Sequence, residues 1–91
     1  MIVFFKLENI LKAKGLAWKD LCDAGISVNM PQKFSKNRGV NTDTIDKVCS
    51  YLNVQPGDIM ERIEPDDFEK VKLEREIESL KNKIGKLKNG N

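Results

Sequence analysis

Glycine interrupts the first sixty residues of this chain repeatedly, at Gly15, Gly25, Gly39 and Gly57. Because glycine is favoured at turns and helix ends and costs stability inside a helix, only short elements fit between these positions. The apolar residues between the glycines recur every three or four positions, which is the spacing of one helix face. We therefore expect a set of short helices around one small core, which suits a chain of 91 residues.

Helical spacing and helix-end signals predict where these elements lie. Helices are expected at about residues 6–14, 18–24, 29–35 and 42–52, with a single helical turn within residues 54–60. Asn29 is the favoured N-cap of the third helix, because Pro31 then falls in the first turn and Gln32 completes a capping box. Either Asn41 or Thr42 is expected to cap the fourth helix.

The two ends of this unit carry residues that favour strands. Residues 1–5 are largely aliphatic and aromatic, and residues 60–64 include the apolar Met60 and Ile63. The sequence allows a short strand pair between these segments, provided that the pair packs on the helices. The expected fold class is therefore an all-α domain of five helices at residues 1–64, with at most a tiny β pairing of its ends.

A second segment begins at Pro65. Asp66 or Asp67 is expected to cap a long helix, in which apolar residues follow at alternating intervals of four and three. This pattern is typical of a coiled-coil seam, and its predicted members are Phe68, Leu73, Ile77, Leu80, Ile84 and Leu87. We expect residues 65–91 to form a homodimer through this seam, the alternative being a helix that is exposed or folded onto its own domain.

Charge is distributed unevenly along this tail. Residues 61–78 contain eight acidic and four basic side chains, a net charge of −4, whereas residues 79–91 contain four lysines and no acid. The helix dipole favours this order of charges, which explains the gradient without any partner. The same gradient would make an antiparallel pair of tails complementary, so antiparallel pairing is slightly favoured over parallel pairing.

The inventory of reactive side chains argues against catalysis. The chain has no histidine, so it lacks the imidazole base of a serine or cysteine nucleophile and the commonest zinc ligand. Cys22 and Cys49 form no C-x-x-C pair and are expected to be buried, reduced thiols. The isolated glycines form no phosphate-binding pattern. We therefore predict no catalytic residue, metal or cofactor, and we infer no small-molecule ligand.

Hydropathy bears on where the protein acts. The longest apolar run covers only residues 2–5, far short of a membrane span, and no secretory signal is visible. We expect no membrane association and a cytoplasmic location.

Four segments occur in an order that resembles one known family. They read K-G-L-A-W-K-D-L at residues 14–21, G-I-S at 25–27, T-D-T-I-D-K-V-C-S-Y-L-N-V at 42–54 and Q-P-G-D-I-M at 55–60. Together they resemble the phage-repressor-like (Cro-type, lambda-repressor-like) helix-turn-helix DNA-binding domain over about residues 6–63. The chain departs from the family pattern in a stretch from Leu21 to Gly25 that is one residue short, and in Pro31, where an aliphatic residue is usual.

The resemblance implies that the third helix enters the major groove of DNA, commonly as part of a dimer on a two-fold operator. Base-reading positions then fall on Val28, Asn29 and Lys33, with Gln32 alongside, and phosphate contacts fall on the loop beyond and at the start of the second helix. Asparagine and glutamine suit the adenine edge, lysine the guanine edge, and valine a thymine methyl group. The full DNA-binding set expected is Lys19, Ser27, Val28, Asn29, Gln32, Lys33, Lys36, Asn37 and Arg38.

Simpler roles remain open for several of these residues. Asn29 and Gln32 could serve only as helix caps. Lys33, Lys36 and Arg38 could be no more than a solvated basic face. Residues 1–60 carry eight basic and six acidic side chains, a modest excess, so tight DNA binding would depend on dimerisation.

Two functions from different classes follow. The leading hypothesis is a dimeric, sequence-specific DNA-binding regulator of transcription, with double-stranded DNA as its partner. The alternative is a protein-interaction module on a modified helix-turn-helix scaffold, which binds a partner protein through residues 65–91. Salt-dependent binding to duplex DNA distinguishes the two, because phosphate contacts release counterions.

Overall fold

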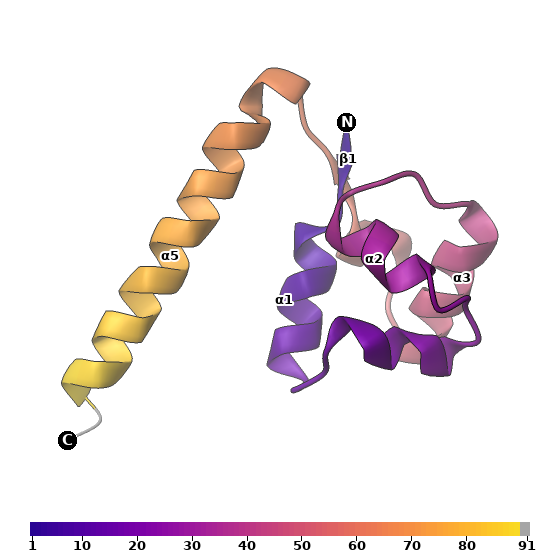
Figure 1. The fold of residues 1–91 in the computed structure, drawn as a ribbon, viewed down its shortest axis with the longest axis horizontal. Helices are drawn as coiled ribbons and strands as arrows, with labels where there is room; N and C mark the ends of the chain where they lie inside the picture. The colour runs from indigo at the N-terminus through magenta and orange to yellow at the C-terminus, as the bar shows by residue number, and fades with distance from the viewer. Residues whose placement is uncertain (90–91) are drawn as a thin grey trace.

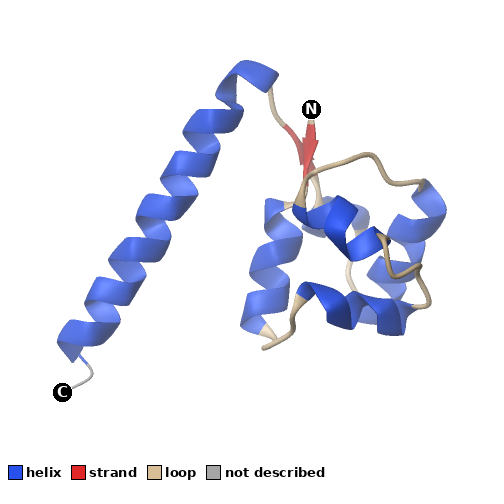
Figure 2. Ribbon diagram, viewed as in Figure 1, coloured by secondary structure: helices blue, strands red, loops and turns tan. Residues whose placement is uncertain are grey.

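The first 62 residues bring their two ends together, and a long helix leaves from the second end (Figure 1). The computed structural model describes residues 1–89, with side chains up to Ile84. Its elements, in chain order, are β1 (Ile2–Val3), α1 (Phe5–Ala13), η1 (Trp18–Ala24), α2 (Met30–Ser35), α3 (Thr42–Leu52), α4 (Pro56–Ile59), β2 (Glu61–Arg62), η2 (Pro65–Asp67) and α5 (Phe68–Asn89). Figure 2 shows how little strand accompanies the helices, and the predicted fold class is confirmed.

One core is enclosed by α1, η1, α2, α3 and α4. Each of these elements contributes a side chain with no exposed surface, namely Leu7, Leu21, Phe34, Val48 and Ile59. Helices this short are marginal in water by themselves. Burial of their apolar faces against one another is therefore what keeps them helical.

The predicted strand pair is present. β1 and β2 run antiparallel, with Val3 opposite Glu61, and a further backbone bond of 2.8 Å joins the Ile63 N–H to the Met1 carbonyl. Val3 is fully buried, which supplies the packing that so short a pair needs. The pair closes the domain and fixes where the chain departs toward α5.

The second helix is wound more tightly than an α-helix. Residues Trp18–Ala24 form the 3-10 helix η1, which ends at Gly25 with a φ of 89°, a left-handed conformation that favours glycine. A 3-10 helix rises about 2.0 Å per residue against about 1.5 Å in an α-helix, so η1 is as long as roughly nine α-helical residues.

The cap of α3 is the first of the two that the sequence allows. The side-chain oxygen of Asn41 accepts the Thr44 N–H at 2.8 Å. At the other end, Asn53 stops the helix with a φ of 56°, a left-handed conformation that asparagine tolerates better than most residues. Both ends of α3 are therefore set by asparagine.

α5 follows the 3-10 turn η2 without a break. Because helical structure already starts at Pro65, with Glu64 at the N-cap position, Asp66 and Asp67 lie in the first turn and are not the N-caps that we expected. Figure 1 shows α5 beside α1 and extending past it. Leu87, the last predicted member of the seam, lies outside the described side chains.

Candidate nucleic-acid interface

η1, the turn after Gly25 and α2 form a helix-turn-helix. The inward side of α2 carries Pro31 and Phe34, both of which are buried. Phe34 meets Phe4 edge to face, with ring centroids 4.8 Å apart, an arrangement that aromatic pairs prefer. Pro31 thus takes the core position that usually holds an aliphatic residue, and it seats α2 on the domain.

The outward side of α2 and the turn before it are exposed to solvent. The side chain of Val28 is 81% exposed, and Asn29 and Gln32 are exposed as well. These three predicted base-reading residues share one open surface. Lys33, the fourth, is half-buried, so its stem packs on the domain while its amine can reach outward.

Asn29 does not cap α2 with its side chain, and the predicted capping box with Gln32 is wrong. Asn29 has φ and ψ angles of −85° and −15°, close to helical values, whereas a side-chain cap needs an extended residue. Its N–H donates instead to the Ser27 Oγ at 3.3 Å. The amides of Asn29 and Gln32 are therefore left available for an external partner.

Three of the predicted DNA-contacting cations, Lys19, Lys36 and Arg38, are exposed. Within the described part of the chain, ion pairs involve Lys12, Lys47, Arg62 and Arg75, and none of the predicted DNA-contacting cations. The described side chains therefore do not neutralise these three cations, which suits contact with phosphate.

Asn37 has a role inside the domain that the sequence did not indicate. Its Oδ1 accepts the Phe4 N–H at 2.7 Å, and its φ of 55° lies in the left-handed region. This bond ties the end of α2 to the start of α1. Of its side-chain groups, only the amide N–H2 remains for the phosphate contact that we expected.

The start of η1 is already occupied by a carboxylate. Asp20 accepts the Ala17 N–H at 2.7 Å through its Oδ2, as a capping residue does. Its negative charge disfavours a phosphate at the same helix end. The phosphate contact expected through the first N–H groups of this helix stays a prediction, and Lys19 beside them is exposed.

The two cysteines differ from each other. Cys49 is buried as expected, but Cys22 is only half-buried, so the prediction of two buried thiols is wrong for Cys22. In the 3-10 winding of η1, Leu21 takes the core position next to it. Burial raises the pKa of the Cys49 thiol above 9.0, and the nearby carboxylates of Asp46 and Asp58 raise it further. A protonated thiol is a poor nucleophile and a poor metal ligand.

The described residues offer neither a cluster of metal ligands nor a membrane-spanning helix. They contain no group of three or more histidine, cysteine, aspartate or glutamate side chains that could hold a metal ion. None of the described helices combines the length and the apolar character needed to cross a membrane.

α5 presents a second surface. Its seam residues Leu73, Ile77, Leu80 and Ile84 are 55%, 44%, 58% and 51% exposed. Phe68 is not part of this seam, contrary to our expectation: its ring stacks on Phe5 of α1 at 6.0 Å. Five residues separate Phe68 from Leu73, which rotates it by about 140° around the helix. That interval, which is neither three nor four, is the signal that excludes it from the seam.

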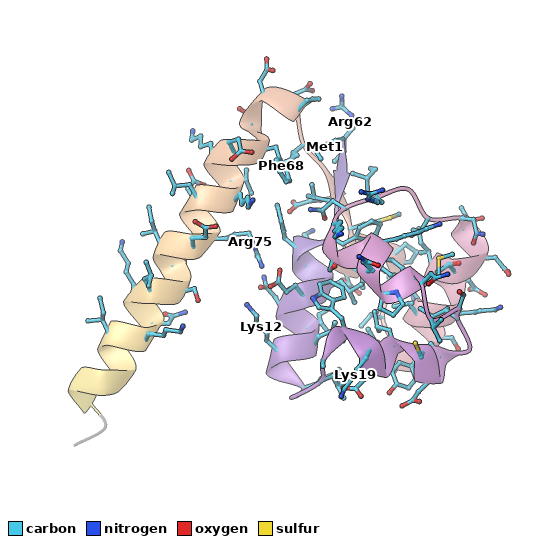
Figure 3. The ribbon with its side chains drawn as sticks, viewed as in Figure 1. Met1, Lys12, Lys19, Arg62, Phe68 and Arg75 are labelled. Carbon is cyan, nitrogen blue, oxygen red and sulfur yellow. The ribbon has the colours of Figure 1, made fainter. Side chains whose placement is uncertain are left out.

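Arg75 was missed by sequence reasoning altogether. It lies on the same side of α5 as Phe68, and both side chains point toward α1 (Figure 3). A lone arginine in a charged helix carries no pattern that would have singled it out. Its partners become visible only once α1 and α5 are placed side by side.

The fold and the bare side of α2 define a helix-turn-helix DNA-binding domain. The chain belongs to the family of the Cro/C1-type HTH DNA-binding domain, whose model matches residues 6–66. Among solved structures it is similar to the transcriptional regulator VanUg (crystal form II), with a TM-score of 0.63 and 28% sequence identity; the match covers 68% of this chain and 84% of that chain. Comparison with curated proteins finds no match. The family and this similarity support a DNA-binding regulator.

Proposed function

We propose that this chain is a sequence-specific regulator of transcription that binds DNA as a homodimer. The observation that carries the proposal is the division of α2 into two sides. Pro31 and Phe34 hold the helix on the core. Asn29 and Gln32 are exposed, and their side chains do not cap the helix. A helix held along one side and bare along the other can enter the major groove without disturbing the fold.

The exposed side chains suit direct readout of bases. The amides of Asn29 and Gln32 can each form paired hydrogen bonds with the N6 and N7 atoms of adenine. Val28, just before the helix, can contact a thymine methyl group, and the amine of Lys33 can donate to guanine. The proposed half-site therefore contains A·T pairs read by the two amides.

Phosphate contacts alone would hold one domain only weakly. Lys19, Lys36 and Arg38 are exposed and can donate to the DNA backbone. So few contacts give low affinity that falls steeply with salt. Two linked domains on two half-sites bind more tightly, because the second contact becomes intramolecular.

The seam of α5 is the proposed dimer interface. Four aliphatic side chains at coiled-coil intervals are largely exposed in the single chain, and pairing with a second copy removes them from water. Charge complementarity favours an antiparallel second copy, because residues 61–78 are acidic overall and residues 79–91 carry only lysine charges. The bound dimer would then regulate by occupying DNA that the transcription machinery needs.

Selection from a pool of random duplexes by the full chain tests this proposal. An enriched duplex and a scrambled copy are then titrated by fluorescence anisotropy at about 50 mM and about 200 mM salt. We expect a motif with two-fold symmetry, tighter binding to the enriched duplex, and loss of affinity at the higher salt. Absence of any enriched motif, with no salt-dependent binding to duplex DNA, would contradict the proposal and favour the protein-interaction module.

A further inference from the structure

Two side chains of α5 hold it against α1 (Figure 3). The ring of Phe68 stacks on that of Phe5, with centroids 6.0 Å apart and planes at 19°. The guanidinium carbon of Arg75 lies 4.6 Å from the centroid of the same Phe5 ring. Arg75 also donates to Glu8 Oε2 at 3.1 Å and to Asn9 Oδ1 at 3.3 Å. We call these five side chains the α1–α5 clasp.

The clasp is most of what α5 buries against the domain. Where side chains of α5 are described, only Phe68, Val71 and Arg75 are half-buried, and all the others are exposed. These three follow at intervals of three and four, so they form one narrow face of the helix. Beyond the clasp, the short link of Ile63 and Glu64 between β2 and η2 ties α5 to the domain.

Arginine is suited to this role. Its flat guanidinium group covers the Phe5 ring while its N–H groups reach two separate acceptors. Glu8 is held from both sides, because its other oxygen, Oε1, lies 3.2 Å from the Lys12 Nζ. The arrangement fixes the direction of the Arg75 side chain, and with it the orientation of α5 relative to α1.

The start of α1 joins the clasp to the reading helix. Phe5 packs on α5 through Phe68, whereas its neighbour Phe4 packs on α2 through Phe34. The Phe4 N–H is also bound to Asn37 at the end of α2. Two adjacent residues at the start of α1, its N-cap Phe4 and its first residue Phe5, therefore contact α2 and α5 respectively.

The clasp and the seam do not compete for the same surface. At about 100° per residue, the half-buried face of α5 and the face that carries Leu73, Ile77, Leu80 and Ile84 point in nearly opposite directions. A second copy of α5 can pair with the seam while α1 stays in place. In the dimer, each DNA-reading domain would then be held on the outside of the paired helices.

We propose that Phe68 and Arg75 are positioning residues that determine the spacing between the two DNA half-sites. This inference rests on the proposed function. The clasp sets the angle between the paired α5 helices and each α2, so it sets the distance and the rotation between the two reading helices. The major groove returns to the same face of DNA about every 10.5 base pairs, so one added base pair turns a half-site by about a tenth of a turn. A dimer with a rigid clasp therefore accepts one spacing.

Loss of the clasp should allow the dimer to bind half-sites at several spacings without altering how each half-site is read. Each domain would stay attached through the link at Ile63 and Glu64, with only Val71 of α5 still half-buried, and could adopt several orientations. Several spacings would then be bound, and the preferred one more weakly, because the added freedom is lost on binding. The reading surface would be unaffected, since Phe68 and Arg75 lie on α5 and not on α2.

The test is a selection from random duplexes, run separately for four full-length proteins. They are the wild type, Phe68→Ala, Arg75→Lys and the matched control Lys70→Arg, which changes an exposed cation of α5 outside the clasp. Phe68→Ala and Arg75→Lys both keep the charge of the chain, so non-specific DNA binding is preserved. Sequencing reports the half-site motif and the distribution of spacings, and sedimentation reports the dimer.

We expect one dominant spacing for the wild type and Lys70→Arg. Phe68→Ala and Arg75→Lys should select the same half-site motif and remain dimeric. The duplexes that they select should contain several half-site spacings, and both variants should bind the wild-type duplex about tenfold more weakly. A single unchanged spacing in both variants would overturn the inference, and so would loss of the half-site motif, which would make the clasp merely structural. If the wild type itself enriches no motif, the proposed function fails, and the inference falls with it.

Discussion

Asn37 shows how a single side chain can fix the end of α2. Its backbone takes a left-handed turn with a φ of 55°, and its side chain holds the Phe4 N–H at 2.7 Å. Asparagine meets both requirements, because it tolerates the turn and carries an acceptor. The position of α2 on the core therefore depends on a residue outside its buried face.

Replacing Asn37 separates these two requirements. Asn37→Ala should lower the free energy of unfolding by about 1–3 kcal/mol, because it leaves the Phe4 N–H without its acceptor and strains the turn. Asn37→Gly relaxes the turn but still lacks the acceptor, so its loss should be smaller. Urea unfolding followed by circular dichroism measures both. Equal stability of the wild type and Asn37→Ala would contradict this account.

Cys49 should make the stability depend on alkaline pH. Its folded pKa is raised above the ordinary value of 9.0 by burial and by neighbouring carboxylates, so the unfolded chain loses this proton first as pH rises. The stabilisation is complete below pH 9 and is lost as pH increases beyond it. Urea midpoints across this range should fall more steeply for the wild type than for Cys49→Ala. Parallel profiles would show that the thiol does not contribute.

The first and last residues of the helices could be predicted from the sequence more accurately than the type of helix that they form. α1 and α3 lie within a residue or two of the expected ranges, because long apolar stripes end at glycine or asparagine. The 3-10 winding of η1 was not visible, since seven residues with mixed spacing fit either type of helix. In the structure, only Leu21 of η1 is buried, and the half-buried residues on both sides of it mark no helical period.

The exposure of predicted residues could be inferred where it depended on local pattern, whereas contacts between distant partners were missed. Val28, Asn29 and Gln32 are exposed, as expected of polar and turn positions at and before the start of α2; their contact with DNA stays a prediction. The packing of Phe68 on Phe5 joins residues 63 positions apart, which no spacing rule reveals. The failed cap at Asn29 has a similar cause, because capping depends on backbone angles that the tertiary structure sets.

The seam of α5 allows a test of dimerisation at the level of the helix. Leu80→Glu should dissociate the dimer in sedimentation experiments, because it places a charge among apolar side chains. The domain should remain folded, since Leu80 is 58% exposed and contributes nothing to the core. Lys81→Gln, which changes the net charge by the same amount, should remain dimeric. A dimer that survives Leu80→Glu would exclude the seam as its interface.

In the whole molecule, the surface proposed to read DNA and the surface proposed to form the dimer lie on different elements. α2 has exposed polar side chains and α5 has exposed aliphatic ones, and Phe4 and Phe5 at the start of α1 contact α2 and α5 respectively. The overall charge is only +2, so long-range attraction to DNA is modest and local placement of cations matters more. Affinity and specificity should therefore depend on the dimer and on the bare side of α2.

The most direct test of this account compares two duplexes with one double variant. Asn29→Ala combined with Gln32→Ala removes both amides from the reading surface. Fluorescence anisotropy should show binding to the enriched duplex weakened by about 10–100-fold, with binding to a scrambled duplex and the urea midpoint unchanged. Unchanged preference for the enriched duplex, or equal weakening on both duplexes together with lower stability, would contradict the claim that α2 reads DNA.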